Sequence, residues 1–182
     1  MLKYQLAQVN IARMKAALDS PVMEGFVSRL AEINALADRS DGFVWRLQTE
    51  SGDATYLRPY DDDRILFNLS VWENVEALKA YVYRTAHAEL IKGRRSWFEQ
   101  FDRAFLALWW VPAGHIPPIE EAKERLAHLD AYGPSPFAFT FKTLFPEPLR
   151  IEGHAADRAA GSAAGGIDAG VEELAQVRHL DE

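Results

Sequence analysis

Cysteine is absent from the 182-residue chain. Its absence excludes disulfide bonds, thiolate nucleophiles and thiolate metal sites, and it is typical of a reducing compartment. Long hydrophobic runs are also absent. No segment approaches the roughly 18 apolar residues of a membrane-spanning helix, and residues 1–14 lack the basic and apolar regions of a signal peptide. These absences lead us to expect a cytoplasmic protein that has no membrane partner.

Acidic side chains outnumber basic ones, 27 to 20, and the negative charge is unevenly distributed. The formal net charge is −7, of which residues 151–182 contribute −5 through seven acidic and two basic side chains. The rest of the chain is nearly neutral, so it has no electrostatic footprint for nucleic acid. Metal-site patterns are missing too, because the histidines show no ligand spacing and His87-Ala88-Glu89 lacks the cysteine pair of a zinc deaminase. We expect neither a nucleic-acid partner nor a bound metal.

Composition divides the chain near residue 150. Residues 152–170 are rich in alanine and glycine, with Ile167 as the one large apolar residue. Such a segment cannot bury enough apolar surface to offset the entropy cost of ordering it. We therefore predict one folded domain over 1–150 and a flexible, acidic, Ala/Gly-rich tail over 151–182.

Hydrophobic periodicity predicts four strands, at 4–12, 42–49, 65–72 and 104–111. Helices are predicted between the first and second strands and between the third and fourth, with Ser20 and Asn74 as N-caps. This order favours an α+β fold, a ferredoxin-like antiparallel sheet with helices on one face. An extra helix ending at Gly133 and a short strand at 137–141 are predicted to follow.

The predicted strands have two unlike sides. One side is purely apolar and consists of Ala7, Val9, Ile11, Ile65, Phe67, Leu69 and Val71. The other side mixes apolar and polar residues: Leu6, Gln8, Asn10, Leu66, Asn68, Ser70 and Trp72. We expect the helices to cover the apolar side. The mixed side is too apolar to face water, so we expect the sheet of a second copy to cover it, forming a homodimeric barrel with a small-molecule cavity.

The segments LAQVNIARM, GFVWRL, LFNLSVWENVEALKAYVYRTAHAEL and LALWWVPAGHIP together resemble the dimeric α/β-barrel superfamily, which includes the antibiotic-biosynthesis monooxygenases. The pattern W-E-x-x-E-A-L-x-A-Y…H over residues 72–87 carries most of this resemblance, which covers about 4–111. A closer resemblance reaches about residue 145. It is to an uncharacterised bacterial family of that superfamily and depends on W-W-V-P-A-G-H-x-P at 109–117.

The resemblance implies a homodimer with a ligand pocket in each subunit. Some members of the superfamily oxidise polycyclic aromatic substrates with molecular oxygen and without metal or flavin, so that the substrate supplies the electrons. Others cleave haem and use an Asn on the first strand, an aromatic residue and a His on the second helix. Asn10 and Tyr81 match the first two positions, but the third falls near Ile91, about one turn beyond His87. This departure from the haem-degrading pattern argues against haem, and we expect no cofactor.

Two residues are candidates for catalysis. His87 would transfer a proton, because an unperturbed histidine titrates near ~6.5, and Asn10 would stabilise a developing oxyanion through its amide. The candidates for ligand binding are Trp72, Asn68, Tyr81, Gln8, Ser70 and Arg46. Arg46 would favour an anionic or phenolate ligand if its side of the second strand lines the cavity.

Each candidate also has a structural interpretation. His87 could be an ordinary helical histidine, and the strand amides could bond to one another across strands or at the dimer interface. His115 could gate the pocket or cap the following helix. Two functions therefore stay open. The first is a small-molecule enzyme or binder, monooxygenase-like, acting on an apolar or aromatic compound; the alternative is a non-catalytic ligand-binding or stress-associated homodimer.

Overall fold

The computed structural model describes residues 3–84 and 93–148, within a compact unit that spans Met1–Leu149. The tail predicted for 151–182 lies outside the described residues. No helix in the described part of the chain is long and apolar enough to cross a membrane. Residues 93–97 are also helical. The named elements, in chain order, are β1 (Tyr4–Arg13), α1 (Glu24–Val27), α2 (Leu30–Asp38), β2 (Phe43–Arg46), β3 (Ile65–Trp72), α3 (Val75–Arg84), β4 (Leu106–Pro112) and α5 (Ile119–Tyr132).

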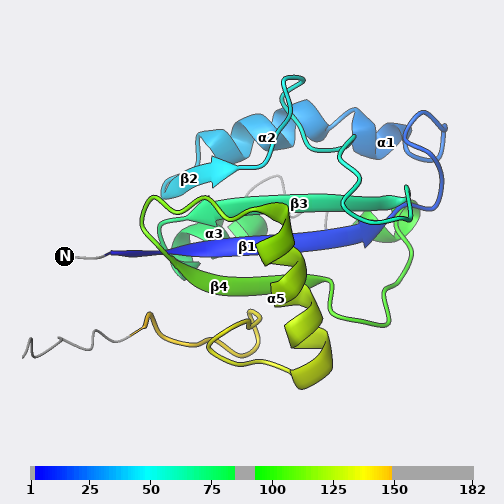
Figure 1. Ribbon diagram of the computed structural model, residues 1–182. Helices are drawn as coiled ribbons and strands as arrows, with labels where there is room; N and C mark the ends of the chain where they lie inside the picture. Colours follow the sequence, from blue (N-terminus) through cyan, green and yellow to red (C-terminus); the bar gives the residue numbers. More distant parts are fainter. Residues whose placement is uncertain (1–2, 85–92, 149–182) are drawn as a thin grey trace, which may run out of the picture. The chain divides into compact units, whose positions relative to one another are not determined.

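The four strands form one antiparallel sheet in the order β2-β3-β1-β4 (Figure 1). This order confirms the ferredoxin-like arrangement predicted from the sequence, and the strand predicted at 65–72 coincides with β3. Besides a local bridge between Thr140 and Thr143, the extra strand predicted at 137–141 is reduced to one bridge to the sheet. In it, Phe139 exchanges two backbone hydrogen bonds with Leu108 on β4, at 2.8 and 2.9 Å.

The helical region after β1 is divided, where one helix was predicted. Ser20 is not its N-cap, since α1 begins at Glu24 after Met23. The chain between α1 and α2 passes through Arg29 with ψ −9°, well away from the helical value near −42°. The prediction of one helix is wrong because hydrophobic periodicity continues across this local change of backbone angle.

Two other helix boundaries confirm the sequence signals. The side chain of Asn74 accepts a 2.8 Å hydrogen bond from the backbone N–H of Ala77 and caps the first turn of α3. Gly133 ends α5 with φ 75°, a backbone conformation that glycine adopts without steric cost. Both signals are local, so they could be recognised without knowledge of the tertiary structure.

Alternation along the strands gives the sheet an even face and an odd face, named after the residue numbers of β1 and β3. The even face carries Leu6, Gln8, Asn10, Leu66, Asn68, Ser70 and Trp72, and its β4 residues are Leu106, Leu108 and Trp110. The odd face carries Ala7, Val9, Ile11, Ile65, Phe67, Leu69 and Val71, and its β4 residues are Ala107, Trp109 and Val111.

The helices that connect the strands cover the even face. Trp72 packs in one cluster with Ala37 of α2 and with Val75 and Leu78 of α3. Our expectation that these helices cover the purely apolar side is therefore wrong. The mixed face tolerates burial beneath helices because its polar side chains bond to one another, as buried polar groups require.

The odd face is covered by α5 of the same chain, which lies on the opposite side of the sheet from α3 (Figure 1). Ala122, Leu126 and Leu129 of α5 pack there, as their spacing predicted. Val9 and Leu69 are each 0% exposed in the single chain. The argument that a second copy must cover a bare sheet face is therefore wrong, and the homodimer itself stays a prediction.

Candidate functional site

Five even-face side chains form one hydrogen-bonded row across β1 and β3, which we call the polar ladder: Trp72, Ser70, Gln8, Asn10 and Asn68. Trp72 Nε1 donates to Ser70 Oγ at 2.9 Å, and Ser70 Oγ lies 2.9 Å from Gln8 Oε1. Gln8 Nε2 donates to Asn10 Oδ1 at 2.8 Å, and Asn68 Nδ2 donates to the same oxygen at 3.2 Å. All five were predicted site residues, and the strand register brings them together.

The polar ladder leads from the interior to the surface. Trp72, Ser70 and Gln8 are buried, Asn10 is partly exposed and Asn68 is exposed. Because Asn10 Oδ1 already accepts two hydrogen bonds, Nδ2 is the remaining polar atom of its amide, and no described residue accepts a hydrogen bond from it. The surrounding even-face positions on β3 and β4 are apolar: Leu66, Leu106 and Leu108. The outer end therefore combines a hydrogen-bond donor with apolar neighbours on the same face.

An aromatic group lies at the inner end of the polar ladder. The Trp72 ring stacks on Tyr81 of α3, with centroids 5.0 Å apart and an interplanar angle of 26°, and it meets the edge of Phe43 at 5.3 Å. The Tyr81 hydroxyl donates to the carbonyl of Ile33 on α2 at 3.3 Å. Burial raises the pKa of Tyr81 well above its ordinary 10.0. Tyr81 is therefore a neutral phenol near pH 7.

Arg46 belongs to the same face but is committed to other partners. It pairs in register with Ser70, while its Nε and Nη2 donate to both carboxylate oxygens of Asp38 at 2.8 and 3.1 Å. Its Nη1 donates to the carbonyl of Gly52 at 2.8 Å. This two-pronged ion pair joins the end of α2 to the edge strand β2. Asp38 is a partner that the sequence analysis did not identify.

His87, the candidate for proton transfer, lies outside the described residues, which omit 85–92. The structure therefore gathers seven of the eight predicted site residues on or above the even face. Five form the polar ladder, Tyr81 stacks on its inner end, and Arg46 lies beside Ser70 with its guanidinium on Asp38. Within the described chain, no group of three or more His, Asp or Glu side chains is placed to hold a metal ion.

A second polar cluster holds α5 against β4, and we call it the α5 clasp: Trp109, His115, Glu121 and Arg125. The buried indole of Trp109 donates to Glu121 Oε1 at 2.8 Å, and His115 Nε2 lies 2.7 Å from Glu121 Oε2. Arg125 Nη2 donates to Glu121 Oε1 at 3.4 Å. His115 thus neither caps the helix backbone nor lies at the polar ladder, because it contacts a side chain in the first turn of α5.

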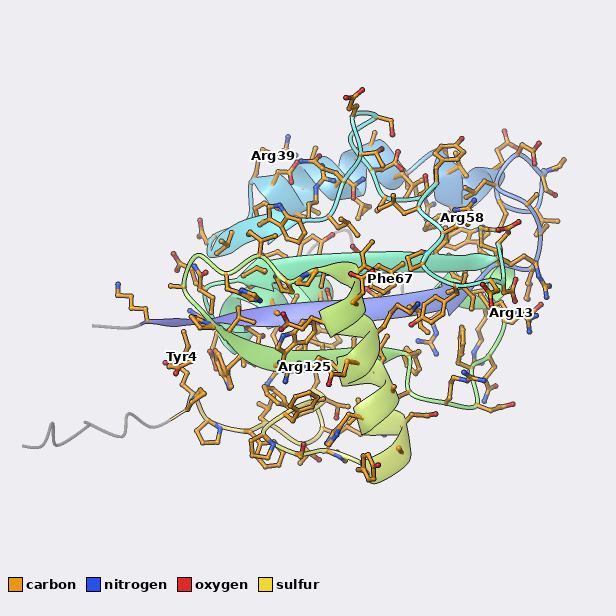
Figure 2. The ribbon with its side chains drawn as sticks, in the orientation of Figure 1. Tyr4, Arg13, Arg39, Arg58, Phe67 and Arg125 are labelled. Carbon is orange, nitrogen blue, oxygen red and sulfur yellow. The ribbon has the colours of Figure 1, made fainter. Side chains whose placement is uncertain are left out.

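The electrostatics of the α5 clasp favour an ionised carboxylate. Burial of Glu121 opposes ionisation, but hydrogen bonds from His115 and Trp109 and the charge of Arg125 outweigh it and lower the Glu121 pKa below 4.5. Arg125 also donates to the carbonyl of Phe137 at 2.9 Å and lies 3.7 Å above its ring. Figure 2 shows Arg125 on α5 and Phe67 on the sheet that this helix covers. Sequence analysis missed Glu121, since an acidic residue in a helix's first turn is common.

A half-open groove of about 510 Å³ lies beside α2 and contains none of the polar ladder. Arg46 and Asp38 are part of its lining, so the two-pronged ion pair borders it. The remaining lining residues are Leu18, Asp19, Val27, Leu30, Ala31, Asn34, Ala35, Ser51, Gly52, Asp53, Thr55 and Tyr56. Of the eight predicted site residues the groove contains Arg46, whereas the polar ladder contains five, so the polar ladder is the better candidate for a site.

Comparison with known proteins gives one family and several structures of similar fold. The model of the family described as a domain of unknown function (DUF3291) matches residues 5–155. A mutant of SnoaB, a cofactor-independent oxygenase from Streptomyces nogalater, is 18% identical, with a TM-score of 0.42 over 63% of this chain and 97% of SnoaB. None of the curated proteins matches the chain significantly.

Two further structures have TM-scores close to that of SnoaB at lower sequence identity. NE2512, a protein of unknown function from Nitrosomonas europaea, is 12% identical, with a TM-score of 0.41 over 65% of this chain and 99% of that one. PA3566 from Pseudomonas aeruginosa is 11% identical, with a TM-score of 0.39 over 64% of this chain and 99% of that one. These likenesses concern the fold and carry no statement about the chemistry of this chain.

Proposed function

The chain belongs to the family described as a domain of unknown function (DUF3291), and from its site we propose that it binds a small apolar or aromatic compound. The compound would lie at the outer end of the polar ladder, and the protein would oxidise it with molecular oxygen and without a cofactor. The observation that supports this proposal is the Asn10 amide, whose Nδ2 has no acceptor among the described residues. A carbonyl or phenolate oxygen of a ligand would supply that acceptor.

The reaction would have to draw its electrons from the substrate. An aromatic compound with an activated methylene loses one proton to give an enolate, and the enolate reduces O₂. One oxygen atom forms the new carbonyl and the other leaves as water, so CH₂ and O₂ become C=O and H₂O. The Asn10 amide would donate to the enolate oxygen as its charge develops. His87, the sequence-based candidate for the proton acceptor, lies outside the described residues.

One observation favours the alternative of a non-catalytic ligand-binding or stress-associated protein. The polar ladder consists of amides, one hydroxyl and one indole. The adjacent Tyr81 is a phenol whose ordinary pKa of 10.0 is raised further by burial, so it is neutral near pH 7. None of these described groups is a base near pH 7, so the described part of the site could hold a ligand without activating it.

Turnover and binding of aromatic compounds, measured with and without oxygen, separate the two functions. We expect Asn10→Ala to weaken both binding and turnover, and His87→Ala to abolish oxygen-dependent turnover while binding persists. Asn34→Ala on α2 is the matched control for Asn10, because it removes an amide outside the polar ladder. Binding without turnover by the unmodified protein would select the alternative function. Binding unaffected by Asn10→Ala would contradict the proposed site.

We also propose the homodimer that the resemblance implies, but with an interface other than the odd face, because α5 covers that face. Sedimentation equilibrium at micromolar concentration tests the association directly. A single species with the mass of one chain at every concentration would contradict it. The ligand site proposed above requires no second copy, so its test is independent of this one.

A further inference from the structure

We infer that Ser70 and Gln8 are positioning residues that set the hydrogen-bond polarity of the site by holding the Asn10 amide in one orientation. This inference depends on the proposed site at the outer end of the polar ladder, and it assigns roles to two residues buried behind it. Ser70 and Gln8 are both 6% exposed. They are the buried polar residues between Trp72 and Asn10, so they would act through Asn10 rather than touch the ligand.

The orientation begins at Trp72, because an indole N–H can only donate. Ser70 Oγ accepts that hydrogen bond at 2.9 Å. The single hydrogen of the Ser70 hydroxyl is donated to Gln8 Oε1, which is 2.9 Å away. A reversed Gln8 amide would donate to Ser70 Oγ as Trp72 does, and the Ser70 hydrogen would then have no acceptor within the polar ladder. The Gln8 amide is thereby held with its oxygen toward Ser70, and its nitrogen must face the opposite way.

The same constraint passes to Asn10. Gln8 Nε2 can only donate, so the atom of Asn10 that lies 2.8 Å away must be the acceptor Oδ1. Asn68 Nδ2 donates to the same oxygen at 3.2 Å and adds to the constraint. A reversed Asn10 amide would place two N–H groups against each other at Gln8, which would leave buried donors unpaired at a free-energy cost. Asn10 is therefore held with Nδ2 toward the ligand.

The functional consequence is a choice of ligand polarity. A site with a fixed N–H donor binds an oxygen acceptor better than a donor of the same size, because a ligand donor would leave two N–H groups facing each other. One hydrogen bond gained or lost in a partly buried site changes affinity by about tenfold. We therefore expect the protein to prefer naphthoquinone, which carries only acceptors, over naphthylamine by about that factor.

The decisive variant is Gln8→Met, which keeps the length of the side chain and removes both of its hydrogen bonds. We expect the dissociation constant of naphthylamine divided by that of naphthoquinone to fall from about 10 to within about twofold of one. Gln5→Met is the matched control, because Gln5 lies on the same strand but bonds to the N–H of Gly114 rather than to the polar ladder. In that variant the ratio should stay near 10. General structural damage would weaken both ligands and leave the ratio unchanged.

Naphthalene separates failure of this inference from failure of the proposed site. If the unmodified protein binds none of the three compounds, the site itself is wrong. If it binds all three and the ratio is the same in Gln8→Met as in the unmodified protein, the positioning roles are wrong and the site stands. Should Gln8→Met fail to fold, Ser70→Ala interrupts the same chain of hydrogen bonds one step earlier, and the ratio should fall in that variant too.

A direct readout needs no ligand. Neutron diffraction from a deuterated crystal locates the amide deuterons of Asn10. We expect them on the atom that faces away from Gln8 in the unmodified protein, and in mixed orientations after Gln8→Met or Ser70→Ala. Deuterons on the atom that faces Gln8 in the unmodified protein would overturn the inference.

Discussion

The indole nitrogen of Trp109 on β4 lies 2.8 Å from a carboxylate oxygen of Glu121 on α5. This hydrogen bond joins a side chain that is 0% exposed to the helix that covers the odd face. His115 and Arg125 contact the same carboxylate from either side. One glutamate therefore satisfies a buried donor and fixes the first turn of α5, so the cover of the odd face depends strongly on it.

Replacing Glu121 by Ala should lower the free energy of unfolding by about 2 kcal/mol, since the buried Trp109 N–H would lose its partner. The free energy is measured by urea denaturation followed by tryptophan fluorescence. The control is Glu120→Ala at the exposed neighbouring position, which should change it by no more than about 0.5 kcal/mol. Equal effects of the two substitutions would contradict the role of the α5 clasp.

The stabilising effect of Glu121 should disappear in acid. Its pKa in the folded protein lies below the ordinary 4.5, so its contribution is full above pH 4.5 and is lost as the pH falls through the folded-state pKa. Urea denaturation of the unmodified protein and of Glu121→Gln, repeated from pH 7 to pH 3, should give a difference in unfolding free energy that shrinks at the acid end. A constant difference over that range would show that the ionised carboxylate is not what stabilises α5.

Tyr81 should affect stability at the alkaline end. Burial raises its pKa above 10.0, so its contribution is full below pH 10 and is lost as the pH rises toward the folded-state pKa. The unmodified protein should therefore lose stability relative to Tyr81→Phe above pH 10, as measured by denaturation at a series of pH values. Ultraviolet absorbance should show one phenol fewer titrating on alkaline unfolding in the variant. An early phenolate signal from Tyr81 in folded protein would contradict its burial.

Arg46 should matter for stability more than for ligand binding, because its guanidinium already bonds to Asp38 and Gly52. Lysine cannot form the two-pronged contact, so Arg46→Lys should lower the free energy of unfolding by about 1 kcal/mol. Affinity for naphthoquinone should stay within about twofold. Arg39→Lys is the control, because Arg39 is the exposed residue that follows Asp38 in the chain, and it should alter neither quantity. A large loss of affinity with unchanged stability would instead support a ligand contact by Arg46.

Much of the geometry of the candidate site could be predicted because strand alternation is local. The alternation of residue numbers alone assigned five residues to one side of the sheet, namely Gln8, Asn10, Asn68, Ser70 and Trp72. The register of β1 and β3 confirms that these residues lie on the same side. Their hydrogen bonds could not be predicted. These depend on which β1 residue lies opposite which β3 residue, and a shift of one position would have moved each side chain to the other face.

The covering of that side was predicted wrongly for a related reason. Periodicity indicates that a helix has an apolar stripe but not which sheet face the stripe contacts. The connecting helices were assigned to the purely apolar face, although both faces carry apolar residues. Which helix covers which face is decided by long-range packing, of α2 and α3 on Trp72 and of α5 on the odd face.

The amino-acid sequence by itself determined the strands and their alternation, the cap at Asn74, the end of α5 at Gly133 and the apolar stripe of that helix. These features arise from residues a few positions apart, whose conformations depend on local backbone and side-chain preferences. Only the tertiary structure decided that α5 covers the odd face, that Arg46 bonds to Asp38 and that the polar ladder ends at Asn10. Each of these joins separate elements, so it depends on how the folded chain packs and pairs its strands.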